Sequence, residues 1–190
     1  QPTLTTQPAN LNYAASNADS RYYNESNLGW GISNPAIYSC KDLPNVNEMT
    51  WYAIYGDPRW DADELWTTMG HLYKGGMWFK KKSVLQGEGH YDKNTAVDGY
   101  DWRTTDQSVS WSPTPSLPSA ADAGKYFYLP ALGDYSDGLL YNVGSIGTYW
   151  SSSARPWSSY YAYVLYFNSG SINVDYNGPR TGGNRVGGFE

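Results

Sequence analysis

The strongest constraint on the fold lies near the C-terminus, where two strand-like segments flank a tight-turn signal. Residues 147–152 and 160–167 are rich in Tyr, Trp, Val and Phe, and Asn168-Ser169-Gly170 follows the second segment. Aromatic and β-branched residues favour strands, and Asn and Gly favour the turns that join antiparallel strands. The sequence therefore predicts antiparallel strands over 147–152 and 160–167, with a third strand around 171–174.

Alternation within the segment 160–167 divides its side chains between two faces, because successive residues of a strand point to opposite sides. One set is predicted to face the core: Tyr161, Tyr163, Leu165 and Phe167. The other set is predicted to face outward: Tyr160, Ala162, Val164 and Tyr166. Tyr161 fits either set. Trp150 in the preceding strand is also predicted to pack in the core.

A helix is predicted to begin near residue 45. Asn45 or Asn47 can cap the free N–H groups of a first turn, and Glu48 lies where the helix dipole favours an acid. Three residues have the spacing of a core-facing stripe: Met49, Tyr52 and Ala53. Gly56-Asp57-Pro58 is expected to end this helix.

The rest of the chain alternates short elements with long loops. A second helix is predicted over 61–70, with Leu65, Trp66 and Met69 inward and Gly70 as the closing residue. Short strands are predicted over 77–79 and 126–130, and long loops over 86–123 and 133–145. The fold class expected is α+β, with two helices and a short, twisted, mostly antiparallel sheet. Residues 1–34 are predicted to form an extended arm, and 35–190 one ligand-binding domain.

Composition excludes several classes of function. The chain has 190 residues, 16% of them charged, and a formal net charge of −5, which argues against nucleic acid as a partner. The run Lys80-Lys81-Lys82 is expected to be a solvated strand end. No stretch is apolar enough to predict membrane insertion. The single cysteine, Cys40, allows no internal disulfide and no Cys-based zinc site, and a buried structural role is expected for it.

Catalytic and metal-binding patterns are also missing from the sequence. His71 and His90 lack metal-ligand spacing, and a serine nucleophile in 151–153 has no identifiable His partner. Asp134 and Asp137 lie in a segment typical of turn chemistry, and calcium held by them with Asp175 is not supported by any motif. We therefore expect a protein that is not an enzyme and that needs no cofactor or metal.

Five short motifs occur in an order that resembles one family. They are Leu43-Pro44-x-x-x-Glu48, Tyr128-Leu129-Pro130-Ala131, Gly147-x-Tyr149-Trp150-Ser151-Ser152-Ser153, Ala162-Tyr163-x-Leu165-x-Phe167-Asn168-Ser169-Gly170 and Arg180-x-x-Gly183-x-x-Val186. Together they resemble the C-type-lectin-like domains of bacterial surface proteins and fimbrial tips. More narrowly, they resemble the variable proteins of diversity-generating retroelements. The related formylglycine-generating enzymes rely on cysteine and metal chemistry, for which this chain offers only Cys40.

The resemblance implies a C-type-lectin-like fold and a variable C-terminal region. In that family an error-prone reverse transcriptase alters adenines, so Asn codons scatter to many residues but never to Lys, Glu, Gln, Met or Trp. From Ser151 to Val186 the chain has no Lys, Glu, Gln or Met, whereas Trp157 departs from this rule. The variable, ligand-binding positions implied are Arg155, Trp157, Tyr160, Val164, Tyr166, Ser171, Asp175, Tyr176, Thr181 and Arg185.

The composition of this region agrees with a binding role. Tyr, Trp, Ser, Gly, Asn and Arg are the residues from which binding loops are built, since aromatic rings give contact area and small polar groups give adaptable hydrogen bonds. We expect a diversified receptor or adhesin that binds a protein or glycan, on the surface of a cell or a virion, extracellularly. Two alternatives remain open: a glycan-binding adhesin of fixed specificity, and a structural tip or tail subunit.

Overall fold

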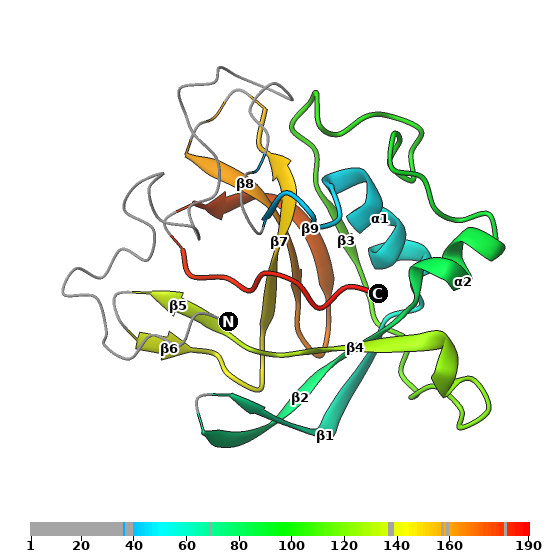
Figure 1. The fold of residues 1–190 in the computed structure, drawn as a ribbon, viewed down its shortest axis with the longest axis vertical. Coiled ribbons are helices and arrows are strands. Elements are labelled where there is room, and N and C mark those ends of the chain that lie inside the picture. The colour runs from blue at the N-terminus through cyan, green and yellow to red at the C-terminus, as the bar shows by residue number, and fades with distance from the viewer. Residues whose placement is uncertain are drawn as a thin grey trace.

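The fold combines helices with antiparallel sheets, as the sequence predicted (Figure 1). The computed structural model describes residues 36, 40–68, 70–136, 139–156, 158, 160–180 and 182–190. The predicted arm 1–34 therefore lies outside the described residues. In the described part, one sheet is formed by β1 (Arg59–Thr68), β2 (His71–Lys80) and β4 (Tyr126–Pro130). A second has the order β3 (Val109–Trp111), β9 (Ile172–Pro179), β8 (Tyr161–Phe167) and β7 (Gly147–Ala154), and a third pairs β5 (Asp134–Ser136) with β6 (Leu139–Tyr141). The pairings within these sheets are antiparallel.

The C-terminal strands form where the sequence predicted them. β7 (Gly147–Ala154) pairs with β8 (Tyr161–Phe167), which pairs with β9 (Ile172–Pro179). The β8–β9 turn is held by Asn168, whose side-chain oxygen accepts hydrogen bonds from the N–H groups of Gly170 and Ser171 at 2.8 and 3.0 Å. β9 continues to residue 179, well beyond the predicted 171–174. The longer strand places Tyr176 and Asn177 beside the start of β8.

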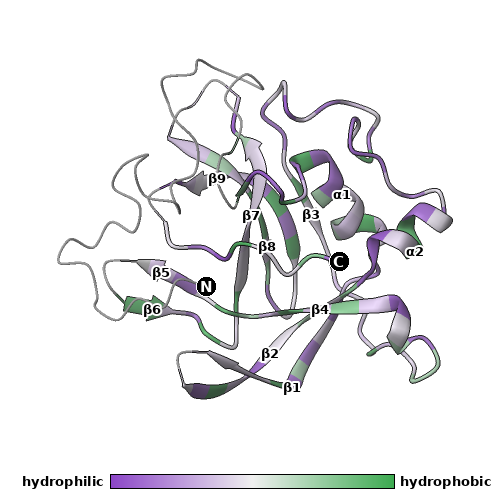
Figure 2. Cartoon of the chain, in the orientation of Figure 1, coloured by the Kyte–Doolittle hydropathy of each residue, from purple (hydrophilic) through white to green (hydrophobic). Residues whose placement is uncertain are grey.

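Helix α1 (Val46–Tyr55) confirms the first predicted helix and its cap. The Asn45 side chain accepts from the Glu48 N–H at 3.0 Å, and the Glu48 carboxylate accepts from the Asn45 N–H at 2.8 Å. This reciprocal pair satisfies two N–H groups that have no partner within the helix. Gly56 ends the helix, and the three predicted core residues are 0–1% exposed. α1 carries both hydrophobic and hydrophilic residues (Figure 2), in keeping with one buried face.

The second predicted helix, over 61–70, is wrong. These residues belong to a hairpin of β1 (Arg59–Thr68) and β2 (His71–Lys80), seen at the bottom of Figure 1. Trp66 pairs with Tyr73 and stacks on it at 5.2 Å, whereas Leu65, predicted to be inward, is 60% exposed. Cross-strand pairing thus overrides a spacing that also fits a helix. Gly70 is the turn residue, with φ of 80°, and Met69 lies outside the described residues.

The two predicted long loops contain short elements. α2 (Lys82–Gly87), β3 (Val109–Trp111) and a 3₁₀ turn (Ala123–Lys125) border or interrupt the first. β5 (Asp134–Ser136) and β6 (Leu139–Tyr141) form a hairpin in the second. β4 (Tyr126–Pro130) confirms the strand predicted over 126–130. The three lysines at the end of β2 each form an ion pair, with Glu88, Glu190 and Glu48 respectively, at 2.8–3.4 Å.

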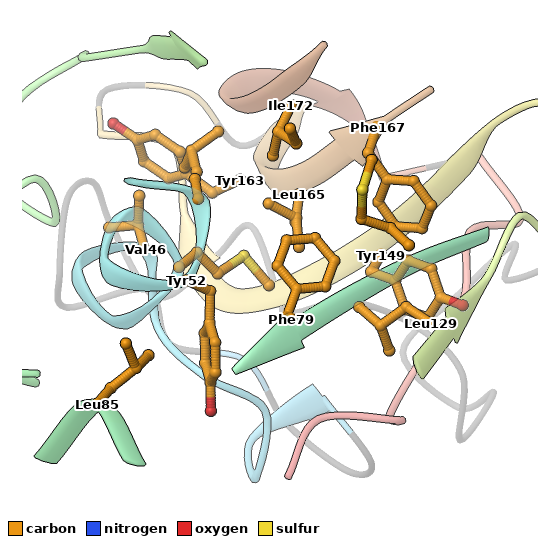
Figure 3. Close-up of a cluster of buried hydrophobic side chains, with 14 of the residues drawn as sticks. Val46, Tyr52, Phe79, Leu85, Leu129, Tyr149, Tyr163, Leu165, Phe167 and Ile172 are labelled. Carbon is orange, nitrogen blue, oxygen red and sulfur yellow. The ribbon is translucent and has the colours of Figure 1, made fainter. Parts of the chain in front are cut away.

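The main hydrophobic core lies where α1 and the two larger sheets meet (Figure 3). β2 and β4 supply Met77, Phe79 and Leu129, and β8 supplies Leu165 and Phe167; all five are fully buried. The Phe79 ring meets the Phe167 ring edge-on at 5.9 Å, and Tyr149 stacks on Phe167 at 5.8 Å. The prediction that Trp150, Tyr163, Leu165 and Phe167 pack inside is confirmed, since none is more than 4% exposed.

Candidate ligand-binding surface

The most densely connected predicted residue is Arg155, in the segment that follows β7. Its Nε and Nη2 donate to one oxygen of Asp106 at 2.9 and 2.7 Å, and its Nη1 donates to Asn177 at 3.1 Å. The guanidinium carbon lies 4.3 Å from the centre of the Tyr176 ring and 5.4 Å from that of Tyr161. Arg155 therefore ties β8 and β9 to the long loop before β3. A guanidinium over an aromatic ring is an attractive arrangement.

Beside this cluster lies the large aromatic residue that is most open to solvent in the C-terminal part that the structure describes. Tyr160 is 56% exposed, and its ring meets the Tyr161 ring edge-on at 4.9 Å. Its N–H group donates to the Ser158 hydroxyl at 3.2 Å, which orders the turn that presents it. The main chain of Tyr160 accepts from the Arg180 N–H at 3.0 Å. Tyr160 is thus an exposed ring on an ordered backbone.

The loop that carries Asp106 is held by hydrogen bonds with β8 and α1. The Tyr163 hydroxyl, buried at the inner face of β8, donates to the Thr105 carbonyl at 2.8 Å, with the Trp102 carbonyl 3.2 Å away, and accepts from the Gln107 N–H at 3.2 Å. Burial raises the pKa of Tyr163, so this hydroxyl stays protonated. Further back, Asn47 of α1 accepts from the Trp102 N–H at 2.9 Å. The helix, the loop and the sheet therefore hold Arg155 and its partners in place.

The structure does not bring all the predicted residues to one surface. Arg155 and Tyr176 contact each other, and Tyr160 is linked to them through Tyr161. Tyr166, on the opposite face of β8, is half-buried and pairs with Thr148 and Asn173. The predicted residues that the structure describes thus divide between two faces of the β8–β9 pair.

Val164 corrects the prediction of an outward-facing position. It is 5% exposed and packs in a second, smaller cluster with Ala36, Cys40, Leu43, Trp150 and Ala162. The chain segment before α1 crosses the outer face of β8 and covers it there. A Cβ added at Gly178 would lie 2.6 Å from a methyl group of Val164, so β9 also packs tightly against this position. Val164 has no free surface to offer a ligand in the isolated chain.

The remaining predicted positions are spread along the sheet. Asp175 is half-buried, pairs with Val164, and accepts from the Asn177 N–H at 2.9 Å. Ser171 lies at the β8–β9 turn, at the far end of the hairpin from Tyr160. Arg185 lies beside β7, where its carbonyl accepts from Trp150 at 2.9 Å and its N–H donates to Thr148 at 3.1 Å. Trp157 and Thr181 lie outside the described residues.

Two contributors to this surface were missed from the sequence: Asp106 and Asn177. Asp106 is 49 residues from Arg155 in the chain, inside what the sequence predicted only as a long loop. The available signal was the length of that loop, because long loops in compact domains are commonly functional. Tyr161 was assigned to either face, and it is half-exposed at the edge of the cluster.

Two hollows lie elsewhere on the described surface. One of about 320 Å³ lies beside α1 and is lined by Glu48, Lys82, Tyr91 and Phe189 among others. None of the eight predicted residues that the structure describes lines it. The other, of about 160 Å³, is lined by Arg185 together with Tyr135 and Leu140 of the β5–β6 hairpin. Neither hollow is lined by Tyr160 or Arg155.

Three side chains of types used in catalysis or metal binding, those of Cys40, His90 and Asp134, make structural contacts instead. Cys40 is 2% exposed and burial raises the pKa of its thiol to about 12, so it is protonated at neutral pH. The His90 ring stacks on Tyr55 at 4.0 Å. Asp134 accepts from the Asn142 side chain at 3.0 Å within its hairpin, and Asp137 is not described. Within the described ranges, no three or more His, Cys, Asp or Glu side chains gather as a metal site would require.

Comparisons with known proteins add no relative to this picture. No protein-family model, curated protein or solved structure matches the chain. Among the described residues, no helix has the length and apolar character needed to span a membrane. The assignment of function therefore depends on the motifs and on the geometry of the surface around Tyr160.

Proposed function

We propose that this chain is a diversified, receptor- or adhesin-type protein of C-type-lectin-like fold, which binds a protein or glycan on another cell or surface. In this proposal a fixed scaffold carries a C-terminal surface whose side chains vary, as in the variable proteins of diversity-generating retroelements. The protein acts extracellularly, on a cell or virion surface, by binding and not by catalysis. The observation that carries the proposal is the exposed Tyr160 next to the Arg155 cluster.

The chemistry of this surface supports binding. Tyr and Arg are the residues that most often dominate the binding energy of protein interfaces, together with Trp. A Tyr ring gives a large contact area with few rotatable bonds, and its hydroxyl can form a hydrogen bond at the rim. The Tyr160 ring is exposed while its backbone is hydrogen-bonded on both sides. A partner therefore meets a preordered ring and loses little entropy in ordering it.

The packing of the resemblance motifs supports the proposed fold. The N–H of Ser152 donates to the Pro44 carbonyl at 2.9 Å, and the Tyr149 hydroxyl donates to the Pro130 carbonyl at 2.7 Å. Arg180 donates to the Tyr161 carbonyl at 3.0 Å. Segments that carry the resemblance, although far apart in the chain, thus meet around β7 and β8. This contact between the motifs supports the proposal that they belong to one scaffold.

A paired substitution tests the binding function. The Tyr160→Ala variant and wild type are screened in parallel against glycan arrays and extracellular protein libraries. Tyr100→Ala is the matched control, because Tyr100 is 70% exposed on a different loop. The proposal requires a ligand that wild type and Tyr100→Ala bind and that Tyr160→Ala does not. A ligand bound equally by all three proteins contradicts the assigned surface, and a polymer formed by the chain itself favours the structural tip subunit.

A further inference from the structure

The surroundings of the Arg155 side chain have the composition of a cation-binding site. Tyr176 lies against one part of the guanidinium at 4.3 Å, and Tyr161 lies at 5.4 Å. The Asp106 carboxylate faces it and accepts two hydrogen bonds through one oxygen, at 2.7 and 2.9 Å. Aromatic faces together with a carboxylate are the groups that recognise guanidinium and ammonium ions. Here the cation belongs to the chain itself.

This arrangement is open to solvent on one side. The side chain of Arg155 is 23% exposed and that of Asp106 is 31% exposed. The second Asp106 oxygen is buried and has no hydrogen-bond partner among the described residues. The carboxylate thus depends on the cation that faces it. If Arg155 were shortened, the walls of the site would remain and a cation from outside could reach it.

The walls of the site are supported independently of Arg155. The Tyr176 ring meets the Tyr163 ring edge-on at 6.4 Å, and Tyr163 holds the backbone on both sides of Asp106 through Thr105 and Gln107. Tyr161 is fixed by strand pairing, opposite Pro179. These contacts do not use the guanidinium. Removing it therefore need not collapse the site.

We propose that Asp106, Tyr161 and Tyr176 form a recognition site for a guanidinium or ammonium group, which Arg155 fills from within the chain. Position 155 then sets the specificity of the surface. With Arg at this position the site is already filled, and with a small neutral residue it binds an arginine or lysine side chain of a protein partner. The proposal deepens the proposed function, because it gives one changeable position a defined chemical effect.

Arg103, on the loop that carries Asp106, provides a matched control. Arg103 binds Asp101 through Nε and Nη2, both at 2.8 Å, with side-chain exposures of 33% and 28%. This pair has side-chain exposures similar to those of the Arg155–Asp106 pair, but Arg103 contacts both carboxylate oxygens and Arg155 only one. No cation–aromatic contact is found for Arg103 within the described residues, whereas Arg155 has two. Shortening Arg103 therefore removes the guanidinium from a carboxylate that has no aromatic walls, while Asp101 keeps its hydrogen bond from the Asn47 side chain at 2.9 Å.

The test measures binding of methylguanidinium chloride to purified variants by calorimetric titration, with sodium chloride and methylurea as controls for ionic strength and shape. Arg155→Ala is expected to bind methylguanidinium saturably, and its thermal unfolding midpoint is expected to rise with the occupancy. Wild type and Arg103→Ala are expected to show no saturable binding. Adding Asp106→Asn to Arg155→Ala is expected to weaken the affinity about tenfold, since the charge-assisted bonds are lost.

Three results would overturn the inference: a folded Arg155→Ala that does not bind, equal binding by wild type, or equal binding by Arg103→Ala. If Arg155→Ala does not fold, Arg155→Gln keeps most of the stem while removing the charge, and the same titration applies to it. Failure here leaves the proposed function intact, because the Tyr160→Ala comparison does not involve a cation. Loss of binding in that comparison, conversely, says nothing about methylguanidinium.

Discussion

The two ends of β8 differ in the environment they give to similar side chains. At the C-terminal end, Leu165 and Phe167 are fully buried between α1 and the two larger sheets. At the N-terminal end, Tyr160 precedes the strand and is 56% exposed, and Tyr161 borders the Arg155 cluster. A single strand thus belongs to the core at one end and to the candidate site at the other. The difference implies that stability and binding can be altered separately along one strand.

The largest expected effect is on the core end. Phe167→Ala removes a fully buried ring that contacts Phe79 and Tyr149, so we expect a loss of about 3–5 kcal/mol in the free energy of unfolding. Urea denaturation followed by circular dichroism measures it. A loss below about 1 kcal/mol, typical of a surface substitution, would show that this end of β8 is not core.

The next effect concerns the outer face of the same strand. Val164→Asp places a carboxylate in the small cluster with Cys40 and Trp150, and we expect it to cost about 3 kcal/mol. Tyr166→Asp is the control, because Tyr166 is on the same face but only half-buried, and it is expected to cost clearly less. Equal stability of the two variants in thermal denaturation would mean that the segment around Cys40 does not cover Val164.

An intermediate effect is expected at the Arg155 cluster. Arg155→Ala removes a partly exposed ion pair and two ring contacts, and we expect a loss of about 1 kcal/mol. The value is small because solvent screens the pair. A loss as large as that of Phe167→Ala would place Arg155 in the structural core, and the distinction between the two ends of β8 would then fail.

The loop that supports the site is expected to be sensitive to acid. Burial alone would raise the pKa of Asp101, but hydrogen bonds from Arg103 and Asn47 outweigh it and lower the pKa. A lowered pKa in the folded state gives stability that is present above the pKa of the unfolded chain, about 4, and is lost as the pH falls through the folded value. Protection against hydrogen exchange in residues 101–107, measured relative to the intrinsic exchange rate at each pH, should therefore fall at low pH before protection in α1. Asp101→Asn should remove that difference, and an unchanged profile would contradict it.

The smallest effect on stability is expected at the exposed end. Tyr160→Ala should change the free energy of unfolding by less than about 0.5 kcal/mol, because the ring is mostly in water. The same variant should lose ligand binding. A destabilisation of several kcal/mol would indicate that the ring is structural, and the proposed surface would be wrong.

Local signals in the sequence predicted the parts of the fold that depend on near neighbours. The α1 cap needs only Asn45 and Glu48, and the β8–β9 turn needs only Asn168 to Gly170. The region 61–70 could not be predicted in this way, because Leu65, Trp66 and Gly70 fit a helix as well as a hairpin. The choice is made by pairing with β2, in which Trp66 faces Tyr73.

The sequence predicted site residues on and next to β8, but not the distant segments that contact them. Alternation correctly placed Phe167 inside, and Tyr160, which precedes the strand, is exposed as predicted, but Ala162, predicted to face outward, is buried. Val164 was misplaced because what covers it is a distant segment that includes Cys40 and Leu43. Asp106 was missed because its role arises from a contact 49 residues away, and a loop has no periodicity from which to infer it.

The central claim, that a fixed scaffold carries a diversified binding surface, is tested most directly by deep sequencing of the gene across a population of its source. The account predicts adenine-derived substitutions at positions such as 155, 160, 166, 171, 175, 176 and 185, with a template repeat nearby. Positions 163, 165 and 167 should stay unchanged, because their side chains are fully buried. A uniform gene without a template, or substitutions spread equally over core and surface, would contradict it.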